Sequence, residues 1–148
     1  MIISRLRVVL LTFLLAGLCG CASDNRPDPK QTVKDLFTAM RNSDSTYITQ
    51  HVDFDRAAGT LGEDLMTDSA VPAGDPSMGL LAAMTGEGKL RTRWLENQIV
   101  LGGATVSGDT AWVEVSFIDR LTRVQYYNKM RLDFRSGRWV INAFKTLQ

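Results

Sequence analysis

Cysteine and histidine are nearly absent from this sequence. Its 148 residues contain two cysteines, Cys19 and Cys21, and one histidine, His51. Because both cysteines lie near the N-terminus, the rest of the chain has no thiol for a disulfide, for thiolate–metal ligation or for a cysteine nucleophile. A single histidine without cysteine is also a poor ligand set for zinc. The sequence therefore predicts no metal centre and no cofactor.

A large excess of charge of either sign is missing as well. Seventeen Lys and Arg residues stand against sixteen Asp and Glu, which gives a net charge of +1. Removal of residues 1–20 takes away Arg5 and Arg7 but no acid, and leaves a net charge of −1. A near-neutral chain has no electrostatic basis for binding nucleic acid. We therefore expect no nucleic-acid partner.

No apolar run is long enough to span a bilayer, which takes about 20 residues. The longest, Val8–Leu18, is interrupted only by Thr12 and follows the cations Arg5 and Arg7. A short apolar run after a positive segment is typical of a signal peptide. We predict that residues 1–20 are a signal peptide and take no part in the fold.

The end of that run resembles the bacterial lipobox, in which an aliphatic residue at −3 and a small residue at −1 precede the lipidated cysteine. Leu18 and Gly20 fit these positions for Cys21, whereas Cys19 would have the bulky Leu18 at −1. The alternatives are an ordinary signal peptide or an uncleaved anchor that happens to contain two cysteines. The resemblance implies a diacylglycerol thioether on Cys21, with residues 21–28 as a short tether. Ala22, in place of Asp, implies anchoring at the outer membrane facing the periplasm.

Two helices are expected after the tether. Asp28 and Pro29 suit the first positions of a helix, and Gln31 completes a pattern like a capping box. One apolar stripe follows at helical spacing, which indicates core packing; it consists of Val33, Leu36, Phe37 and Met40. Asp44 or Ser45 is expected to cap a second helix.

Residues 53–88 are hard to interpret because glycine and proline interrupt them repeatedly. Val71–Ser77 is expected to be a surface loop. Met78–Thr85 is apolar nearly all round and must be covered by something. It could fill the core, contact a partner or form a mobile flap over a pocket, with Met78, Leu80, Leu81 and Met84 as the lid residues. A further helix is expected over Lys89–Glu96.

The C-terminal half alternates between apolar and polar residues with a period of two, which is typical of half-buried strands. Strands are expected over 98–106, 110–119 and 123–135, and in a last strand through Trp139 and Ile141. Gly108 and Gly137 supply the turns of tight hairpins. Successive hairpins predict an antiparallel sheet with one dry and one mixed face.

This layout resembles small bacterial lipoproteins of unknown function with a cystatin-like, nuclear-transport-factor-like cone fold. The resemblance is carried by Val33–Met40, Asn42–Asp44, Val106–Val115 and Ser136–Ile141. It implies an α+β domain over residues 29–148, with N-terminal helices packed on a curved antiparallel sheet of about four strands. The same fold hosts isomerases, hydrolases and many proteins that are not enzymes, so it assigns no function.

Strand alternation predicts few polar groups inside the cone. Asn128 and the Tyr126 hydroxyl face inward with the apolar residues, and neither is an obvious general base. We therefore predict no catalytic residue on the strands. His51, Asp53 and Asp55 form the one cluster with catalytic or metal-binding potential. At a helix end their side chains would diverge, so solvated acids beside a helix-end histidine are the expectation.

The other face of the sheet is rich in aromatic and arginine residues, which is typical of interfaces. The candidate interface residues are Trp112, Ile118, Tyr127, Arg131 and Phe144. The alternative is a solvated face covered by helices or by the C-terminal tail. The leading hypothesis is a non-catalytic, lipid-anchored envelope protein that binds its own copy or another envelope protein. A carrier or sensor of a small apolar ligand in the cone is the alternative, and an enzyme comes third.

Overall fold

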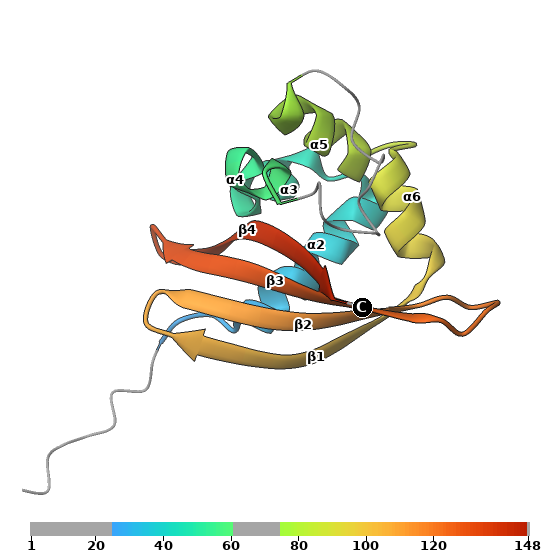
Figure 1. Ribbon diagram of the computed structural model, residues 1–148. Helices are drawn as coiled ribbons and strands as arrows, with labels where there is room; N and C mark the ends of the chain where they lie inside the picture. Colours follow the sequence, from blue (N-terminus) through green and yellow to red (C-terminus); the bar gives the residue numbers. More distant parts are fainter. Residues whose placement is uncertain (1–24, 61–74, 148) are drawn as a thin grey trace, which may run out of the picture.

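The computed structural model describes residues 25–60 and 75–147. The predicted signal peptide, Cys21 and most of the predicted loop Val71–Ser77 lie outside the described residues. Within them, five helices pack on one face of a curved, four-stranded antiparallel sheet (Figure 1). The α+β architecture expected from the sequence is confirmed.

Helix α2 (Pro29–Asn42) lies along the concave face of the sheet and buries the whole predicted stripe. The side chain of Asp28 caps it by accepting a backbone N–H of the first turn, and Ser43 ends it in a left-handed conformation with φ of 53°. The predicted capping box is wrong in one detail. The Gln31 side chain donates to the Asp35 carboxylate at 2.7 Å rather than reaching back to the cap.

Three shorter helices also begin at an aspartate whose side chain accepts backbone N–H groups of the first turn, namely Asp44, Asp53 and Asp75. Free N–H groups at a helix start need such partners. The short α4 (Phe54–Ala58) was not expected, because glycine and proline obscure the sequence pattern around it. The helices after α2 are α3 (Ser45–His51), α4 (Phe54–Ala58), α5 (Pro76–Met84) and α6 (Lys89–Glu96).

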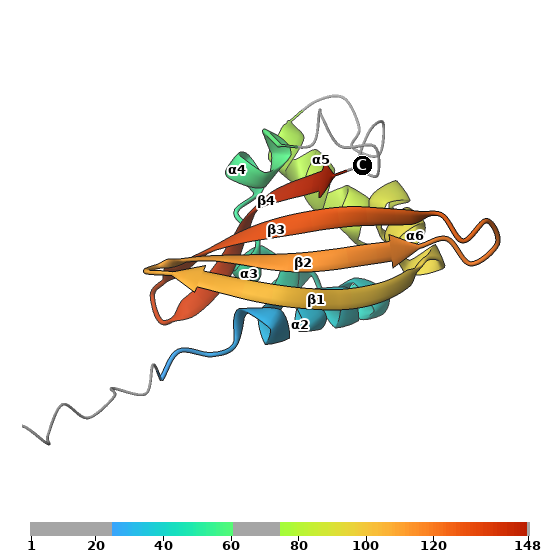
Figure 2. The same ribbon diagram turned by 60° about the horizontal axis from the view of Figure 1, so that its bottom comes forward.

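The sheet is a simple meander in the order β1-β2-β3-β4 (Figure 2). Gly108 and Gly137 have positive φ angles of 57° and 80°, as the tight β1–β2 and β3–β4 hairpin turns require. The strands are β1 (Gln98–Ser107), β2 (Thr110–Ile118), β3 (Gln125–Arg135) and β4 (Arg138–Leu147). The first three strands lie within two residues of their expected bounds, and β4 extends past the expected last strand to Leu147.

Two bulges bend the sheet. In β1 the register shifts between Leu101 and Ala104, so that Gly102 and Gly103 together oppose Glu114 of β2. This confirms the break expected at the glycine pair. A second bulge lies in β4, where the register against β3 shifts between Arg131 and Leu132. An extra residue in one strand sends every later side chain to the opposite face.

The β4 bulge corrects one prediction. Leu132 pairs with Ile141 and Arg131 pairs with Ala143, so Asn142 is the extra residue. Phe144, which strict alternation places on the outer face, is instead fully buried in the core. It therefore cannot belong to an exposed interface.

Large side chains fill the space between the helices and the sheet. The Trp94 ring lies 5.3 Å from both the Phe117 and the Phe144 rings, and Phe37 lies 5.9 Å from Trp94 and from Phe117. Such offset and edge-to-face contacts are favourable beyond the area they bury. These four aromatic residues, from α2, α6, β2 and β4, join the helical layer to the sheet.

Candidate functional site

The outer face of the sheet is the surface that the described elements leave open. All five helices lie on the opposite side of the sheet, and Figure 2 shows the four strands with no helix in front of them. Cross-strand pairs between β2 and β3 build this face, as antiparallel pairing requires. The pairs are Thr110 with Asp133, Trp112 with Arg131, Glu114 with Lys129, Ser116 with Tyr127 and Ile118 with Gln125.

Aromatic and cationic groups meet near the middle of this outer face. The Arg131 guanidinium carbon lies 5.7 Å from the centre of the Trp112 ring, within the range of a cation–π contact. Tyr127 is 52 % exposed, and Trp112 and Ile118 are half-buried. The structure thus places four of the five candidate interface residues on one open face, and only Phe144 departs from it.

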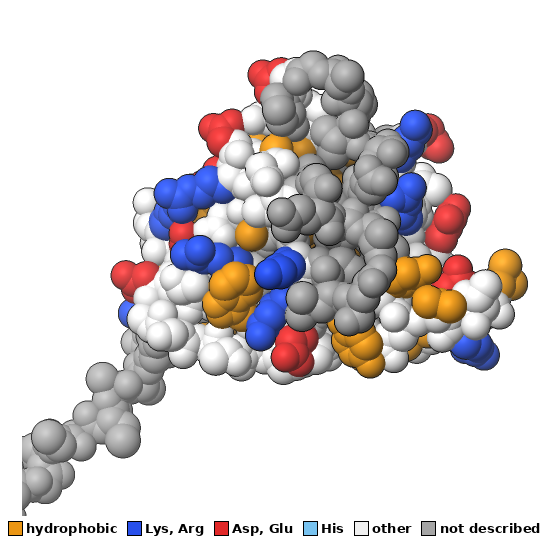
Figure 3. Space-filling model, viewed as in Figure 1, with side chains coloured by type: hydrophobic (Ala, Val, Ile, Leu, Met, Phe, Trp, Pro, Cys, Tyr) orange, Lys and Arg blue, Asp and Glu red, His pale blue; other side chains and the backbone are white. Residues whose placement is uncertain are grey.

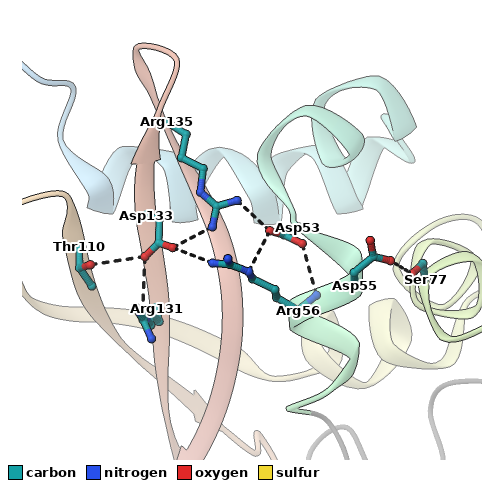
Figure 4. A network of polar contacts seen from close by, with 8 residues as sticks. All are labelled: Asp53, Asp55, Arg56, Ser77, Thr110, Arg131, Asp133 and Arg135. Atoms are coloured by element: carbon teal, nitrogen blue, oxygen red, sulfur yellow. Dashed lines mark hydrogen bonds and ion pairs between the residues drawn. The ribbon is translucent and has the colours of Figure 1, made fainter.

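An ion-pair network lies at the edge of the outer face, next to α4 (Figure 4). Arg135 donates to Asp53 at 2.9 Å and to Asp133 at 2.8 Å, and Arg56 donates to Asp133 at 3.2 Å. Arg131 lies 3.5 Å from the same Asp133 carboxylate. The network attaches α4 to β3. Asp133 and Arg135 are therefore already bound to side chains of the same domain. The part of the outer face that stays open consists of the cross-strand pairs further along β2 and β3.

The pKa of the Asp133 carboxyl reflects two opposing effects within this network. Its partial burial alone would raise its pKa, but the hydrogen bond from Arg135 and the charges of Arg131, Arg135 and Arg56 together lower the pKa below its usual value. Asp133 is therefore ionised at neutral pH and holds cations from both β3 and α4.

In the part of the chain that the structure describes, the interior of the cone contains few polar groups. Asn128 is buried, and Tyr126 is half-buried against the core. The β4 bulge adds Asn142, which is 4 % exposed. Among the described residues, the buried Asn142 Oδ1 and Trp94 Nε1 atoms have no hydrogen-bond partner. Strict alternation could not have identified Asn142, because only the bulge turns it inward.

The four candidate lid residues separate in the structure. Leu80 and Met84 of α5 are fully buried members of the core, Leu81 packs against it, and Met78 is 66 % exposed. Buried, well-packed side chains are not those of a mobile flap. The core-filling interpretation of α5 agrees with this placement, and the flap interpretation does not.

The His51, Asp53 and Asp55 side chains diverge, as expected at a helix end. His51 Nδ1 lies 3.0 Å from the Tyr47 carbonyl oxygen, Asp53 binds Arg135, and Asp55 accepts a hydrogen bond from Ser77. No group of three or more potential metal ligands occurs among residues 25–60 and 75–147.

The tyrosine beside this histidine is a poor proton donor or acceptor at neutral pH. The Tyr47 ring stacks on the His51 ring with 4.0 Å between centroids. Burial of the hydroxyl and, to a smaller extent, the nearby Asp35 charge raise the pKa of Tyr47 to about 12. The hydroxyl therefore stays protonated over the physiological range.

A groove between α2 and β1 was not foreseen. It has a volume of about 260 Å³ and is open to solvent, with Lys34 and Arg41 among its lining residues. The remaining lining residues are Phe37, Thr38, Ile99 and Leu101. No sequence signal could have identified it, because α2 and β1 are more than 50 residues apart and only the packing brings them together.

None of the helices in the described part of the chain is long and apolar enough to cross a membrane. No protein-family model and no curated protein matches the sequence. Solved structures do match. A designed NTF2-like protein, Rd1NTF2_05, has a TM-score of 0.53 at 14 % identity, over 80 % of this chain and 95 % of that one.

Two further structures resemble the chain more weakly. A SEC-C motif containing protein from Rhodopseudomonas palustris has a TM-score of 0.47 at 14 % identity, over 81 % of this chain and 79 % of that one. A DUF4783 family protein from Bacteroides ovatus has a TM-score of 0.40 at 11 % identity, over 75 % and 89 % respectively. The likeness to the designed protein shows an NTF2-like α+β fold and nothing about activity.

Proposed function

We propose that this chain is a non-catalytic, lipid-anchored protein of the cell envelope, and that its domain presents the outer face of the sheet to a second copy of itself or to another envelope protein. The observation that carries the proposal is that the described helices cover one face of the sheet and leave the other face open. All the described helices pack on the concave face, while Trp112, Tyr127 and Arg131 lie on a face that no described helix covers. Aromatic and arginine side chains in this arrangement are typical of interfaces.

The anchor is the part of the proposal that the sequence supports. Leu18 and Gly20 precede Cys21 in the lipobox pattern, and two or more acyl chains hold a protein stably at a membrane where one does not. Ala22 favours the outer membrane, with the domain facing the periplasm. The test is the intact mass of the mature protein, made with Cys21→Ser and, as its matched control, Cys19→Ser. Loss of lipid mass in both variants or in neither would contradict lipidation of Cys21.

The interaction is tested by native mass spectrometry of residues 23–148. A dimer without additional mass, reduced to monomer by Trp112→Ala or Tyr127→Ala, is the result expected for self-association through the outer face. Val106→Ala is the control, because Val106 is 46 % exposed but pairs with the buried Ala111, on the opposite face of the sheet. A bare monomer would leave only a different protein as partner, to be sought by crosslinking at position 127. A dimer unaffected by both aromatic substitutions would count against the outer face.

The second candidate function is the carriage or sensing of a small apolar ligand within the cone. It is favoured by the buried Asn142 Oδ1 and Trp94 Nε1 atoms, since buried polar atoms normally have partners and a ligand could supply them. The same mass spectrum tests it. A monomer that carries a reproducible additional mass, lost in an Asn142→Leu variant, would favour the carrier over the interaction domain.

A further inference from the structure

The segment just before α2 is bound to one end of the sheet. Arg26 Nη1 donates to the Gly108 carbonyl oxygen at 2.7 Å and lies 2.9 Å from the Asp109 carboxylate, both at the β1–β2 turn. The Arg26 guanidinium also lies 5.0 Å from the centre of the Phe134 ring at the end of β3. This one side chain therefore contacts two hairpins.

The next residue is held by a second, independent contact. The indole Nε1 of Trp139 donates to the Pro27 carbonyl oxygen at 2.6 Å. Trp139 is 1 % exposed and packs edge-on against Phe134 with 5.1 Å between ring centroids. A hydrogen bond from a buried, well-packed ring fixes the position of the backbone that accepts it. We call Arg26 and Pro27 the strap.

The strap determines where the chain enters the domain. It lies beside the β1–β2 and β3–β4 turns, while the β2–β3 hairpin forms the opposite end of the sheet (Figures 1 and 2). Strand β3 contains 11 residues, so at about 3.4 Å per residue the two ends are separated by roughly 37 Å.

The chain between Cys21 and the strap is short compared with the length of the sheet. Cys21 precedes Arg26 by five residues, which can span at most about 18 Å. This reach is about half the length of the sheet. An anchored domain must therefore keep its strap end near the bilayer.

We infer that the strap fixes the orientation of the domain on the membrane, with the β1–β2 and β3–β4 turns facing the lipid surface and the β2–β3 hairpin directed away from it. This rests on the proposed lipidation of Cys21. The hairpin carries Leu121, which is 94 % exposed, and Val124, which is 46 % exposed, and Figure 3 shows hydrophobic side chains gathered there. In this orientation the hairpin and the outer face are presented to the periplasm rather than covered by lipid.

The charges of the outer face do not favour a domain that lies flat on a bilayer. Lys129 stands opposite Glu114 and Arg131 lies 3.5 Å from Asp133, so cations of the face are matched by carboxylates. Carboxylates add little attraction to an anionic lipid surface, and burying them against lipid is unfavourable. A domain lying flat on this face is the alternative that the experiment distinguishes.

The test places one dye at each of three sites of the mature, lipidated protein in vesicles of phosphatidylethanolamine and phosphatidylglycerol that contain a headgroup quencher. The variants are Ser136→Cys at the β3–β4 turn, Glu114→Cys on the outer face and Leu121→Cys on the far hairpin. Because the first and last sites lie roughly 37 Å apart, we expect about twofold or greater quenching at position 136 than at 121, with 114 between them. Equal quenching at all three, or strongest quenching at 114 or 121, would overturn the orientation.

Two variants distinguish the effect of the contacts made by the strap from the effect of positive charge at this end of the sheet. Arg26→Ala removes the contacts to Gly108, Asp109 and Phe134 and is expected to reduce the difference between positions 136 and 121. Arg138→Ala removes an exposed cation of the same end that makes no such contact with the other described residues, and is expected to leave the difference unchanged. If both variants act alike, charge rather than the strap would orient the domain, and the inference would be wrong.

Failure of the anchor gives a different result. The wild-type protein is expected to take up no dye, because a lipidated Cys21 has no free thiol, and to float with the vesicles. Dye on the wild type, or protein that does not float, would count against lipidation. Vesicle-bound protein without the expected order of quenching would count against the orientation alone.

Discussion

The two faces of this four-stranded sheet are built from the same alternating sequence but differ in what covers them. The concave face carries Val113, Val115, Phe117, Met130 and Leu132, all buried beneath the helices. The outer face carries Trp112, Glu114, Tyr127 and Lys129, half-buried or exposed. Stability therefore depends mainly on the concave face, because that is where apolar area leaves water. Substitutions on the outer face are therefore expected to change stability less than substitutions on the concave face.

The largest effect is expected from a pair of aromatic residues that strict alternation places on the same face. Phe144 is fully buried against Trp94, whereas Tyr127 is 52 % exposed. We expect Phe144→Ala to lower the free energy of unfolding by about 3–5 kcal/mol and Tyr127→Ala to change it by less than about 0.5 kcal/mol. Urea unfolding measures both. Similar losses in the two variants would show that Phe144 is not in the core.

A smaller effect tests the helical layer at the junction of α5 and α6. A Cβ atom at Gly88 would lie 2.3 Å from the Ala83 carbonyl oxygen and 2.4 Å from that of Ala82, so the backbone must shift. We expect Gly88→Ala to cost about 1–3 kcal/mol in thermal or urea unfolding. Gly59→Ala is the control, because its Cβ would meet only an ordinary contact at 3.4 Å and its φ is −64°. An equal cost at both positions would exclude close packing as the cause.

The ion-pair network at the edge of the outer face predicts a pH dependence. Because the pKa of Asp133 is lowered in the folded state, its contribution is present above the unfolded value of about 3.9 and is lost as the pH falls through the folded value. Asp133→Asn should therefore destabilise the protein at pH 7, and the difference from wild type should shrink as the pH falls below about 4.

Urea unfolding at a series of pH values measures this dependence. Glu87→Gln, which removes an exposed carboxylate, is the control and should leave the pH profile unchanged. If the Asp133→Asn difference were constant from pH 7 to low pH, the ionised carboxylate would not be what connects α4 to β3.

The smallest effect concerns a cross-strand pair on the open part of the outer face. Glu114 stands directly opposite Lys129. We expect Glu114→Lys to cost about 0.2–1 kcal/mol through like-charge repulsion, and a second change, Lys129→Glu, to restore most of that loss. A double-mutant cycle in urea gives the coupling. A cycle with no coupling would mean that the pair is too well solvated to contribute.

The helical stripe and the strand alternation were sufficient to predict most of the fold. The cap at Asp28 with the stripe from Val33 to Met40 located α2, and the glycines at 108 and 137 located two hairpins. The placement of Trp112, Tyr127 and Arg131 on one face of the sheet could also be predicted, because they lie on alternate positions of paired strands. These features are local, and each depends on residues at most a few positions apart.

Features that depend on contacts between distant segments could not be predicted in this way. The β4 bulge at Asn142 reverses the face of Phe144, since one extra residue changes the parity of all that follow. The burial of Leu80 and Met84, the pairing of Asp53 with Arg135 and the docking of Arg26 and Pro27 each join parts of the chain that are remote in sequence. Local patterns in the sequence were enough to predict all of the described helices and strands except the short α4, their order and the lipobox pattern at Cys21. Two features became visible only in the folded domain: which side of β4 faces the core, and from which end the chain enters the domain. Both depend on packing between distant segments rather than on local periodicity.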